Sequence, residues 1–399
     1  MRSVLYITYD GLTDPLGQSQ ILAYLKRLGK NNSIVILSFE KKELYTKEGK
    51  TMKQIIDTSN LIWVPVSYTR KPPIFSTMLD IRKGLRLAQQ LHKQHKFQIV
   101  HCRGYISAII GRRLKAKFNL KFIFDMRGWW ADEKKESGYW DSKIYQPVYC
   151  YFKKLERKFF READYSVSLT YKGKEEIERQ KLATPEKVGV IPTCVDFEIF
   201  KPFDEQVRQS IRKELGVYDH EKVFVYSGSL GGNYDPHILI NVFQAYRKVH
   251  PQSFLLILSK DQLDEHLSAL FKSEKIDRIK ILNLPFMRVT NYLRASDIGF
   301  VYYKMSFSTI GRSPTKMGEY WASGVPVISF QGIGDLDIII PKYPGSGVLL
   351  SDKTAHWELQ FKSSQFASRE QLRSFSEDYF HIDKGAEFYE AVYEKLVPF

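Results

Sequence analysis

The sequence predicts an α/β protein with two domains, each a parallel sheet that helices cover on both faces. The chain has 399 residues, 43% of them hydrophobic, which is enough to bury two cores of ordinary size. Short apolar segments alternate with longer periodic ones, the pattern of parallel strands joined by helices. The alternation restarts after the segment VIPTCVD at residues 190–196, so we place the domains at residues 1–195 and 196–380.

The first half contains seven apolar segments that we expect to form strands, and three periodic segments that we expect to form helices. Parallel sheets bind ligands beyond the carboxyl ends of their strands, so site residues are expected in the loops that follow strands. The strands are predicted at residues 4–8, 34–39, 61–66, 98–101, 122–125, 165–169 and 188–191, and the helices at 19–28, 78–95 and 105–118.

Two of these loops carry charged residues that suit an acceptor site. His101 and Arg103 follow the fourth strand, although a histidine in that place is also a common structural residue. Asp125 ends the fifth strand, and Arg127 and Trp129 follow it, which predicts a platform for a sugar ring and a diphosphate. The alternative interpretation is that Asp125 pairs with Arg127 only to cap the sheet edge.

Charge is distributed unevenly along the chain. Residues 1–195 carry 36 Lys and Arg against 19 Asp and Glu, a net charge of +17, and the remaining residues have a net charge of −2. Such a field favours an anionic partner, and without a recognisable nucleic-acid motif we expect a membrane surface and no nucleic acid. Basic helix ends at residues 82–86 and 112–117 are the candidates, whereas the aromatic helix at 144–163 is expected to pack in the core. Ordinary solvated lysines are the alternative explanation.

In the second half, a glycine-rich turn at residues 227–233 follows a strand and precedes a helix. Gly228 and Ser229 lie in this turn, whose successive backbone amides are expected to form an anion-binding nest. Strands are predicted at residues 223–226, 254–258, 279–282, 298–302 and 325–328, and helices at 236–249 and 383–396.

Residues 311–328, GRSPTKMGEYWASGVPVI, have an unusual arrangement of charge. Ser313 is expected to cap a helix that begins at Pro314. Arg312 and Lys316 then lie at the positive end of the helix dipole, a conflict that a bound phosphate would remove. Glu319 lies one turn further on the same face, where a carboxylate suits a pair of ribose hydroxyls. A plain surface pair of Lys316 and Glu319 is the alternative.

This segment resembles the donor-binding segment of GT-B glycosyltransferases, and within them the retaining family 4 enzymes of bacterial capsule, O-antigen and lipopolysaccharide synthesis. Those enzymes carry two glutamates separated by seven residues, the second followed by Ala-x-Gly-x-Pro-Val. Glu319 matches the second glutamate, with Ala322, Gly324 and Pro326–Val327 in register. The first glutamate would fall at Gly311, so the family's usual contact to the donor sugar is missing from this chain.

The resemblance implies two Rossmann-like domains that face a central cleft, with a C-terminal helix at 381–399 that returns to the first domain. It implies that the first loop, through Gly17 and Gln18, closes near the donor phosphates. It also implies transfer of a sugar from a nucleotide-diphosphate sugar, such as a UDP- or GDP-sugar, to a glycan acceptor that is expected to be lipid-linked. Retention is expected, while an inverting reaction would need a general base, for which Asp125 is the candidate.

The expected role of Lys316, with Arg127 and Asp125, is therefore catalytic, and we expect neither a metal nor another cofactor. The absence of a long apolar run, together with three cysteines that lack paired spacing, predicts a cytoplasmic protein at the inner face of the membrane. Two alternatives stay open: a sugar-nucleotide epimerase of the same fold, and a non-catalytic protein that binds nucleotide sugars.

Overall fold

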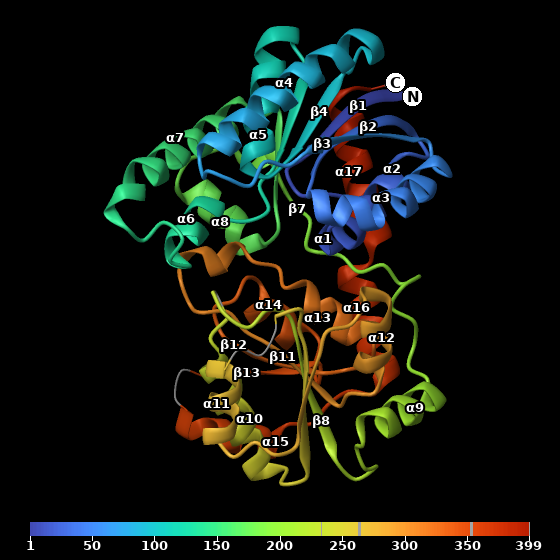
Figure 1. The fold of residues 1–399 in the computed structure, drawn as a ribbon, viewed down its shortest axis with the longest axis vertical. Coiled ribbons are helices and arrows are strands. Elements are labelled where there is room, and N and C mark those ends of the chain that lie inside the picture. The colour runs from blue at the N-terminus through green and yellow to red at the C-terminus, as the bar shows by residue number, and fades with distance from the viewer. Residues whose placement is uncertain (233, 262–264, 352–353, 399) are drawn as a thin grey trace. The chain divides into compact units, whose positions relative to one another are not determined.

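The computed structural model describes residues 1–232, 234–261, 265–351 and 354–398. Its contacts divide the chain into two compact units, one of Met1–Cys194 with Ile382–Phe399 and the other of Val195–His381. In Figure 1 the C-terminal helix, drawn in red, lies among the blue and green elements of the first unit. The predicted return segment also includes Phe399, which lies outside the described residues.

The first unit, which we call the N-terminal unit, is built on a seven-stranded parallel sheet with the order β3-β2-β1-β4-β5-β6-β7. The order reverses between β1 and β4, because the chain adds strands on one side of β1 and then on the other. The strands are β1 (Arg2–Thr8), β2 (Asn32–Glu40), β3 (Leu61–Ser67), β4 (Ile99–Arg103), β5 (Lys121–Asp125), β6 (Tyr165–Ser168) and β7 (Val188–Val190).

Helices cover this sheet, and the last one comes from the far end of the chain. That helix packs against α2 and completes the core beside β1, where Arg2 forms an ion pair with Glu390 at 2.9 Å. The helices are α1 (Pro15–Gly17), a π-helical turn (Gln18–Leu22), α2 (Ala23–Leu28), α3 (Lys42–Asp57), α4 (Phe75–His95), α5 (Gly104–Phe118), α6 (Trp130–Glu136), α7 (Gln146–Glu162), α8 (Tyr171–Arg179) and α17 (Ile382–Leu396).

The second unit, the C-terminal unit, contains a six-stranded parallel sheet with the order β10-β9-β8-β11-β12-β13, which reverses between β8 and β11. Its strands are β8 (Lys222–Ser227), β9 (Ser253–Leu258), β10 (Ile279–Leu282), β11 (Ile298–Val301), β12 (Val327–Phe330) and β13 (Gly347–Leu350). Its helices are α9 (Glu205–Leu215), α10 (Pro236–Val249), α11 (Glu265–Ser273), α12 (Phe286–Arg294), α13 (Thr315–Ala322), α14 (Leu336–Lys342), α15 (Trp357–Ser363) and α16 (Arg369–Phe380).

The predicted α/β fold class is confirmed, with several differences in detail. β4 continues to Arg103, so His101 lies inside the strand rather than after it. β12 begins at Val327 instead of residue 325, because Pro326 has no amide to donate to the ladder. β13 was not predicted, since its four residues show no clear alternation of buried and exposed positions. α7 buries Phe152, Phe159 and other residues of one face, as expected for a core helix.

Candidate functional site

The sheet order of the C-terminal unit selects one place for a ligand. β8 and β11 are the two strands between which the order reverses, and their carboxyl ends lead to Gly228 and to Tyr302. The amide of Ser227, the last residue of β8, donates to the hydroxyl of Tyr320 on α13 at 2.9 Å. The crevice beyond such strands is where doubly wound sheets bind ligands, so α13 is held at the expected binding edge.

Close packing fixes α13 there. Gly299 of β11 leaves room for the ring of Tyr320, since a Cβ at that position would lie 2.5 Å from the ring. Gly318 lies against other side chains rather than against a ligand, because a Cβ there would meet Val195 at 2.6 Å and Phe380 at 3.1 Å. The hydroxyl of Ser376 donates to the carbonyl of Gly318 at 2.9 Å. The helix is therefore a rigid support for the side chains that it carries.

Lys316, on the first turn of α13, lies between two aromatic rings. Its ammonium is 4.5 Å from the ring centroid of Tyr226 and 4.6 Å from that of Tyr234. It also lies 3.5 Å from the Tyr226 hydroxyl, and a Cβ on Gly228 would come within 2.6 Å of it. Burial lowers the pKa of Lys316 to about 7, with Glu319 opposing the shift. The interpretation of Lys316 as part of an ordinary surface pair is therefore wrong.

Two further charged residues flank this lysine. The guanidinium of Arg312 lies over the ring of Tyr303, 4.7 Å from its centroid, which holds a second cation near the start of α13. Glu319 follows Lys316 by one turn, and burial raises its pKa to about 7 against the influence of Lys316. The helix begins one residue later than predicted, with Pro314 rather than Ser313 as its N-cap.

The glycine-rich turn does not present the predicted row of free amides. The amides of Gly228 and Gly231 donate to backbone carbonyls of Leu258 and Tyr234, at 2.9 and 2.7 Å. The amide of Leu230 donates to the carboxylate of Asp261 at 2.6 Å, so a side chain of the unit already occupies an anion position. Asn233, the last residue of the predicted turn, lies outside the described residues.

Ser229 contributes to the site through its carbonyl, which accepts a hydrogen bond from the Tyr226 hydroxyl at 2.6 Å. This bond fixes the ring that lies beside Lys316. The cations beside this turn are Lys316 and Arg312, and the turn itself mainly holds the aromatic rings in place.

In the N-terminal unit, β4 and β5 bring the predicted acceptor residues together. Arg103 and Asp125 are register partners, and the carboxylate of Asp125 lies 3.9 Å from Arg103, from His101 Nε2 and from Arg127. The hydroxyl of Tyr389 on α17 donates to Asp125 at 3.0 Å. Asp125 pairs with Arg127 as one interpretation expected, but it also joins a larger buried cluster.

Burial and charge oppose each other in this cluster. Burial alone would raise the pKa of Asp125, but Arg127, His101 and Arg103 outweigh it and lower the pKa. Burial lowers the pKa of His101 despite the nearby Asp125. Four inward polar atoms have no hydrogen-bond partner within the described parts of the chain. They are Asp125 Oδ1, His101 Nε2, Arg103 Nε and Arg127 Nη1, a set that could bind a polar group.

Trp129 does not form the predicted sugar platform in this structure. Its side chain is fully buried, with the ammonium of Lys153 5.1 Å from its ring centroid. The loop turns inward there, because Arg127 and Gly128 both have positive φ, 56° and 104°. Arg127 keeps its guanidinium beside Asp125, whereas the tryptophan ring lies 6.5 Å, between centroids, from that of Phe160 on α7.

The first loop is anchored by a buried carboxylate. Glu40 accepts hydrogen bonds from the amides of Leu12 and Thr13, at 2.8 and 3.2 Å. Gly17 is buried where a Cβ would lie 2.1 Å from the carbonyl oxygen of Gly11, so glycine is needed to close the loop. Gln18 is partly exposed and begins the π-helical turn Gln18–Leu22, an irregularity that is frequent at functional sites.

Comparison with known proteins identifies the N-terminal part of the chain. Residues 20–199 match the model for Glycosyltransferase Family 4. This stretch forms a family 4 glycosyltransferase domain. The curated D-inositol 3-phosphate glycosyltransferase of Corynebacterium glutamicum (strain R) is 24% identical over 212 residues, which is 50% of this chain and 48% of that protein. The chain thus spans about half the length of the curated relatives it matches.

Solved structures resemble the whole chain. A complex of Anabaena Alr3699/HepE with UDP-glucose matches with a TM-score of 0.72 and 10% identity, over 99% of this chain and 100% of that one. WaaG, described as a glycosyltransferase involved in lipopolysaccharide biosynthesis, matches with a TM-score of 0.66 and 12% identity, over 96% and 99% of the two chains. The GT-B fold with a family 4 domain, predicted by resemblance, is confirmed.

Five tyrosines around the family 4 domain's Asp125 cluster and around Lys316 were missed by sequence reasoning. Two come from α17, where Tyr389 contacts Asp125 and the hydroxyl of Tyr393 lies 2.8 Å from His101 Nδ1. Their spacing of four residues places both on one helix face, a signal visible in the sequence. The other three are Tyr226, Tyr234 and Tyr303. Tyr226 lies near the end of β8, and Tyr303 follows β11 by two residues.

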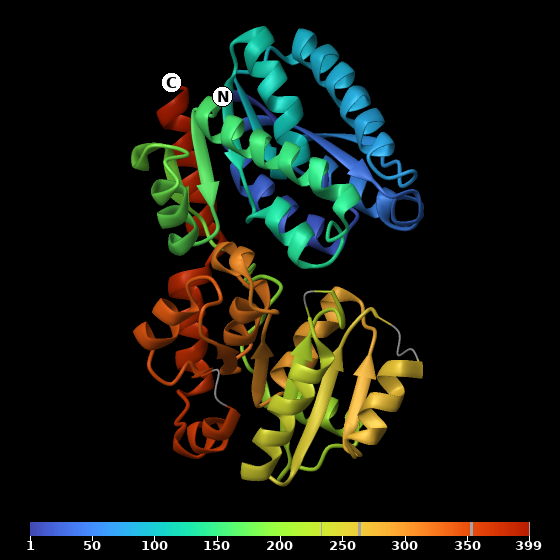
Figure 2. The same ribbon diagram turned by 90° about the vertical axis from the view of Figure 1, so that its left-hand side faces the viewer.

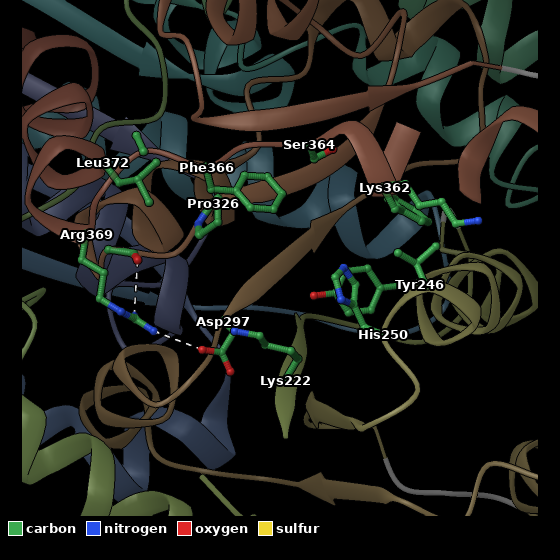
Figure 3. A pocket seen from close by; sticks show the side chains of 14 residues that line it. Lys222, Tyr246, His250, Asp297, Pro326, Lys362, Ser364, Phe366, Arg369 and Leu372 are labelled. Atoms are coloured by element: carbon green, nitrogen blue, oxygen red, sulfur yellow. Dashed lines mark hydrogen bonds and ion pairs between the residues drawn. The ribbon is translucent and has the colours of Figure 1, made fainter. Parts of the chain in front are cut away.

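A hollow of about 430 Å³ also lies in the C-terminal unit (Figure 3). Lys222, Asp297 and Pro326, which line it, start or precede β8, β11 and β12, so the hollow lies at the amino ends of the strands. Arg369 crosses it and bonds to Asp297 and to the carbonyl of Gly324, both at 3.3 Å. Since doubly wound sheets bind ligands at the opposite edge, we exclude this hollow from the candidate site.

Proposed function

We propose that the chain is a glycosyltransferase that binds a nucleotide-diphosphate sugar through its C-terminal unit. The observation that carries the proposal is the position of Lys316. Lys316, an amine of lowered pKa, lies with a second cation, Arg312, and a carboxylate, Glu319, at the edge where the sheet order reverses. Two cations suit a diphosphate, and a carboxylate one turn away suits the hydroxyls of a ribose.

Lys316 would assist departure of the nucleotide diphosphate. Negative charge grows on the phosphate oxygen as the bond to the sugar breaks, and that charge raises the proton affinity of a nearby amine. The ammonium of Lys316 would therefore bind the transition state more strongly than the ground state, which is the condition for catalysis. The proposed leaving-group stabilisation needs no metal and no other cofactor.

The buried Asp125 cluster favours retention over inversion. A general base for an inverting reaction must reach the acceptor and have a pKa near the working pH. The side chain of Asp125 is only 1% exposed, it already accepts a bond from Tyr389, and neighbouring cations lower its pKa. We therefore assign Asp125 the role of positioning its neighbours Arg103, His101 and Arg127. Of these, we propose that Arg127, whose side chain is the most exposed at 12%, meets the acceptor.

The proposed acceptor is a lipid-linked glycan of bacterial surface polysaccharide synthesis, with the enzyme bound at the inner face of the membrane. Two observations support this proposal: the net charge of +17 in residues 1–195 and the resemblance to WaaG. UDP is the first nucleotide to test, because the structural neighbour Alr3699/HepE was crystallised with UDP-glucose.

A donor assay on the full chain tests the proposal. Candidate UDP- and GDP-sugars are incubated with the protein, and both nucleotide binding and release of free sugar are measured. A transferase should hydrolyse one donor slowly, and Glu319→Gln should weaken binding whereas the surface variant Glu358→Gln should not. An epimerase would instead change the sugar while the nucleotide stays attached. Binding without any turnover would favour a non-catalytic protein. This alternative is tested because Gly311 stands where the resembling enzymes have their first glutamate.

A further inference from the structure

α4 presents large apolar side chains on a face that its own unit leaves uncovered. Phe75, Met78 and Leu79 are 67%, 48% and 48% exposed, and Ile74 just before the helix is 45% exposed. The helical three share one face, because they are three and four positions apart. In Figure 2 α4, drawn in light blue, runs along the outside of the N-terminal unit beside α5.

The opposite face of α4 anchors it to the unit. Gly84 lets the helix approach closely, since a Cβ there would lie 2.8 Å from both Ile110 and Phe39. Asp80 is fully buried and accepts hydrogen bonds from the amide of Thr69 at 2.9 Å and from the hydroxyl of Tyr9 at 3.1 Å. The exposed apolar residues therefore stand on a fixed helix.

Basic residues continue the same exposed face. Arg82, Lys83 and Arg86 follow Phe75 by seven, eight and eleven positions, and all three are exposed. Arg70 and Lys71, just before the helix, are exposed as well. Asp80 is the single acidic residue between positions 67 and 97, and it points inward. We call residues 70–86 on this face the α4 tip, an apolar end surrounded by positive charge.

The other basic helix end that the sequence suggested, at residues 112–117, has two of its four cations neutralised. Arg112 pairs with Glu162, and Lys115 pairs with Asp164 at 2.6 Å. In the α4 tip Lys83 pairs with Asp80 at 3.4 Å, but among the described residues Arg70, Lys71, Arg82 and Arg86 form no ion pair. The tip therefore keeps most of its charge and also offers apolar side chains. A nucleic acid would pair with the cations but leave Phe75, Met78 and Leu79 in water, whereas a bilayer interface accommodates both kinds of group.

We propose that the α4 tip inserts its apolar side chains into an anionic lipid bilayer, with its arginines and lysines at the level of the headgroups. Among the described residues, no helix is long and apolar enough to cross a bilayer, so this contact would be interfacial. The proposal deepens the proposed function, because a lipid-linked acceptor lies in the same interface, but vesicle binding itself does not depend on catalysis.

Vesicle co-sedimentation of the full chain tests the insertion. Binding is compared between phosphatidylcholine vesicles and vesicles with 30% phosphatidylglycerol, at low and high salt. We expect binding that requires the anionic lipid and weakens with salt. The triple variant Phe75→Ser, Met78→Ser and Leu79→Ser should reduce partitioning at least tenfold, and so should Arg82→Gln with Arg86→Gln. Leu359→Ser, at a residue 68% exposed in the C-terminal unit, is the control and should bind as the wild type does.

A Phe75→Trp variant reports insertion directly, because its fluorescence should shift to the blue on anionic vesicles and stay unchanged on neutral ones. The proposal is overturned if the protein ignores vesicles, if neutral vesicles bind equally, or if the triple variant binds as the wild type does. Nucleotide affinity is measured in parallel and should be the same in all variants. Loss of donor turnover with intact vesicle binding would contradict the proposed function and leave this proposal standing.

Discussion

Lys316 is the residue whose environment departs most from that of a surface lysine. Lys316→Met keeps the apolar stem between the rings of Tyr226 and Tyr234 but removes the charge. A hydrogen bond to a charged group contributes about 1.5–3 kcal/mol, so the affinity for UDP should fall roughly ten- to a hundredfold. Isothermal titration calorimetry measures this. Lys342→Met is the matched control, since Lys342 lies over the ring of Tyr343, far from β8. The UDP affinity of this variant should equal that of the wild type.

The lowered pKa of Lys316 makes a second prediction about nucleotide binding. A bound diphosphate favours the ammonium and raises this pKa above its free value of about 7. Affinity should therefore be highest below pH 7 and should fall between pH 7.5 and 9.5, by at most about tenfold per pH unit. The diphosphate is fully ionised over that range, so it does not cause the fall.

Glu319 has a raised pKa in the same range as that of Lys316, so both residues could cause the pH dependence. The Lys316→Arg variant distinguishes their contributions. A guanidinium stays charged to pH 12 and above, so the variant should bind UDP with a flatter pH profile, whatever its affinity at pH 7. An unchanged slope in this variant would assign the pH dependence to Glu319 or to the ligand and would contradict the role given to Lys316.

Tyr393 is predicted to act through His101 rather than on a substrate. Its hydroxyl lies 2.8 Å from His101 Nδ1, which leaves Nε2 directed at Asp125. Tyr393→Phe should lower donor turnover about three- to tenfold, the loss expected for one hydrogen bond, and should shift the pH optimum. UDP affinity should stay the same. Tyr149→Phe, which loses a comparable 2.8 Å bond to Asp132, should alter neither turnover nor its pH profile.

At the two candidate sites, the sequence predicted the positions of charged side chains better than the positions of aromatic rings. Arg312 and Lys316 were selected because their charges conflict with a helix dipole, and Glu319 because it follows Lys316 by one turn; both are local properties. Trp129 was misjudged because exposure depends on the positive φ of Arg127 and Gly128, which turns the chain inward. No local rule reveals that rotation for an arginine, since positive φ favours other residues.

At the scale of elements, the turn after β8 leaves space for Lys316, because Gly228 has no side chain. Gly228→Ala would place a Cβ 2.6 Å from the Lys316 ammonium and would displace it. UDP affinity should fall about tenfold or more, in addition to any effect of the backbone strain that alanine causes at a positive φ. Gly231→Ala is the matched control, because Gly231 also has positive φ, 128° against 147°, but a Cβ there has nothing within 4 Å. Equal losses in both variants would show that backbone strain, and not the lysine, is responsible.

Elements buried on both sides were the easiest to predict. β1, β2, β8 and β9 are continuous apolar segments, and their central positions are all buried. β13 lies at the sheet edge and is only partly buried, and its four residues GVLL do not alternate; β10, at the other edge and also partly buried, was predicted because IKIL alternates apolar and polar residues at its start. The extra residues of β4 follow from pairing with β5, since Arg103 joins the ladder opposite Asp125. Register with a neighbouring strand cannot be read from one segment alone.

At the scale of the whole molecule, the proposed donor and membrane contacts belong to units with separate cores. Each unit has its own sheet and its own buried clusters, and the positive charge is concentrated in residues 1–195. The proposed donor site lies in the nearly neutral unit, where specific cations would have to hold a nucleotide diphosphate. The basic unit would attract an anionic surface over a longer range.

This division predicts two thermal transitions, only one of which responds to nucleotide. UDP at a hundred times its dissociation constant adds about 2.7 kcal/mol to the unit that binds it, which raises the midpoint of its transition by about 5–11 °C for a unit of this size. Differential scanning calorimetry should show this shift in the transition of the C-terminal unit.

Leu255→Ala and Leu37→Ala assign the transitions, since each removes a fully buried leucine from one sheet and should cost about 2–5 kcal/mol in that unit alone. The transition lowered by Leu255→Ala is the one that UDP should raise. If UDP instead raised the transition lowered by Leu37→Ala, the nucleotide would bind the N-terminal unit. The assignment of Lys316 and Glu319 to a donor site would then be wrong, because both residues belong to the other core.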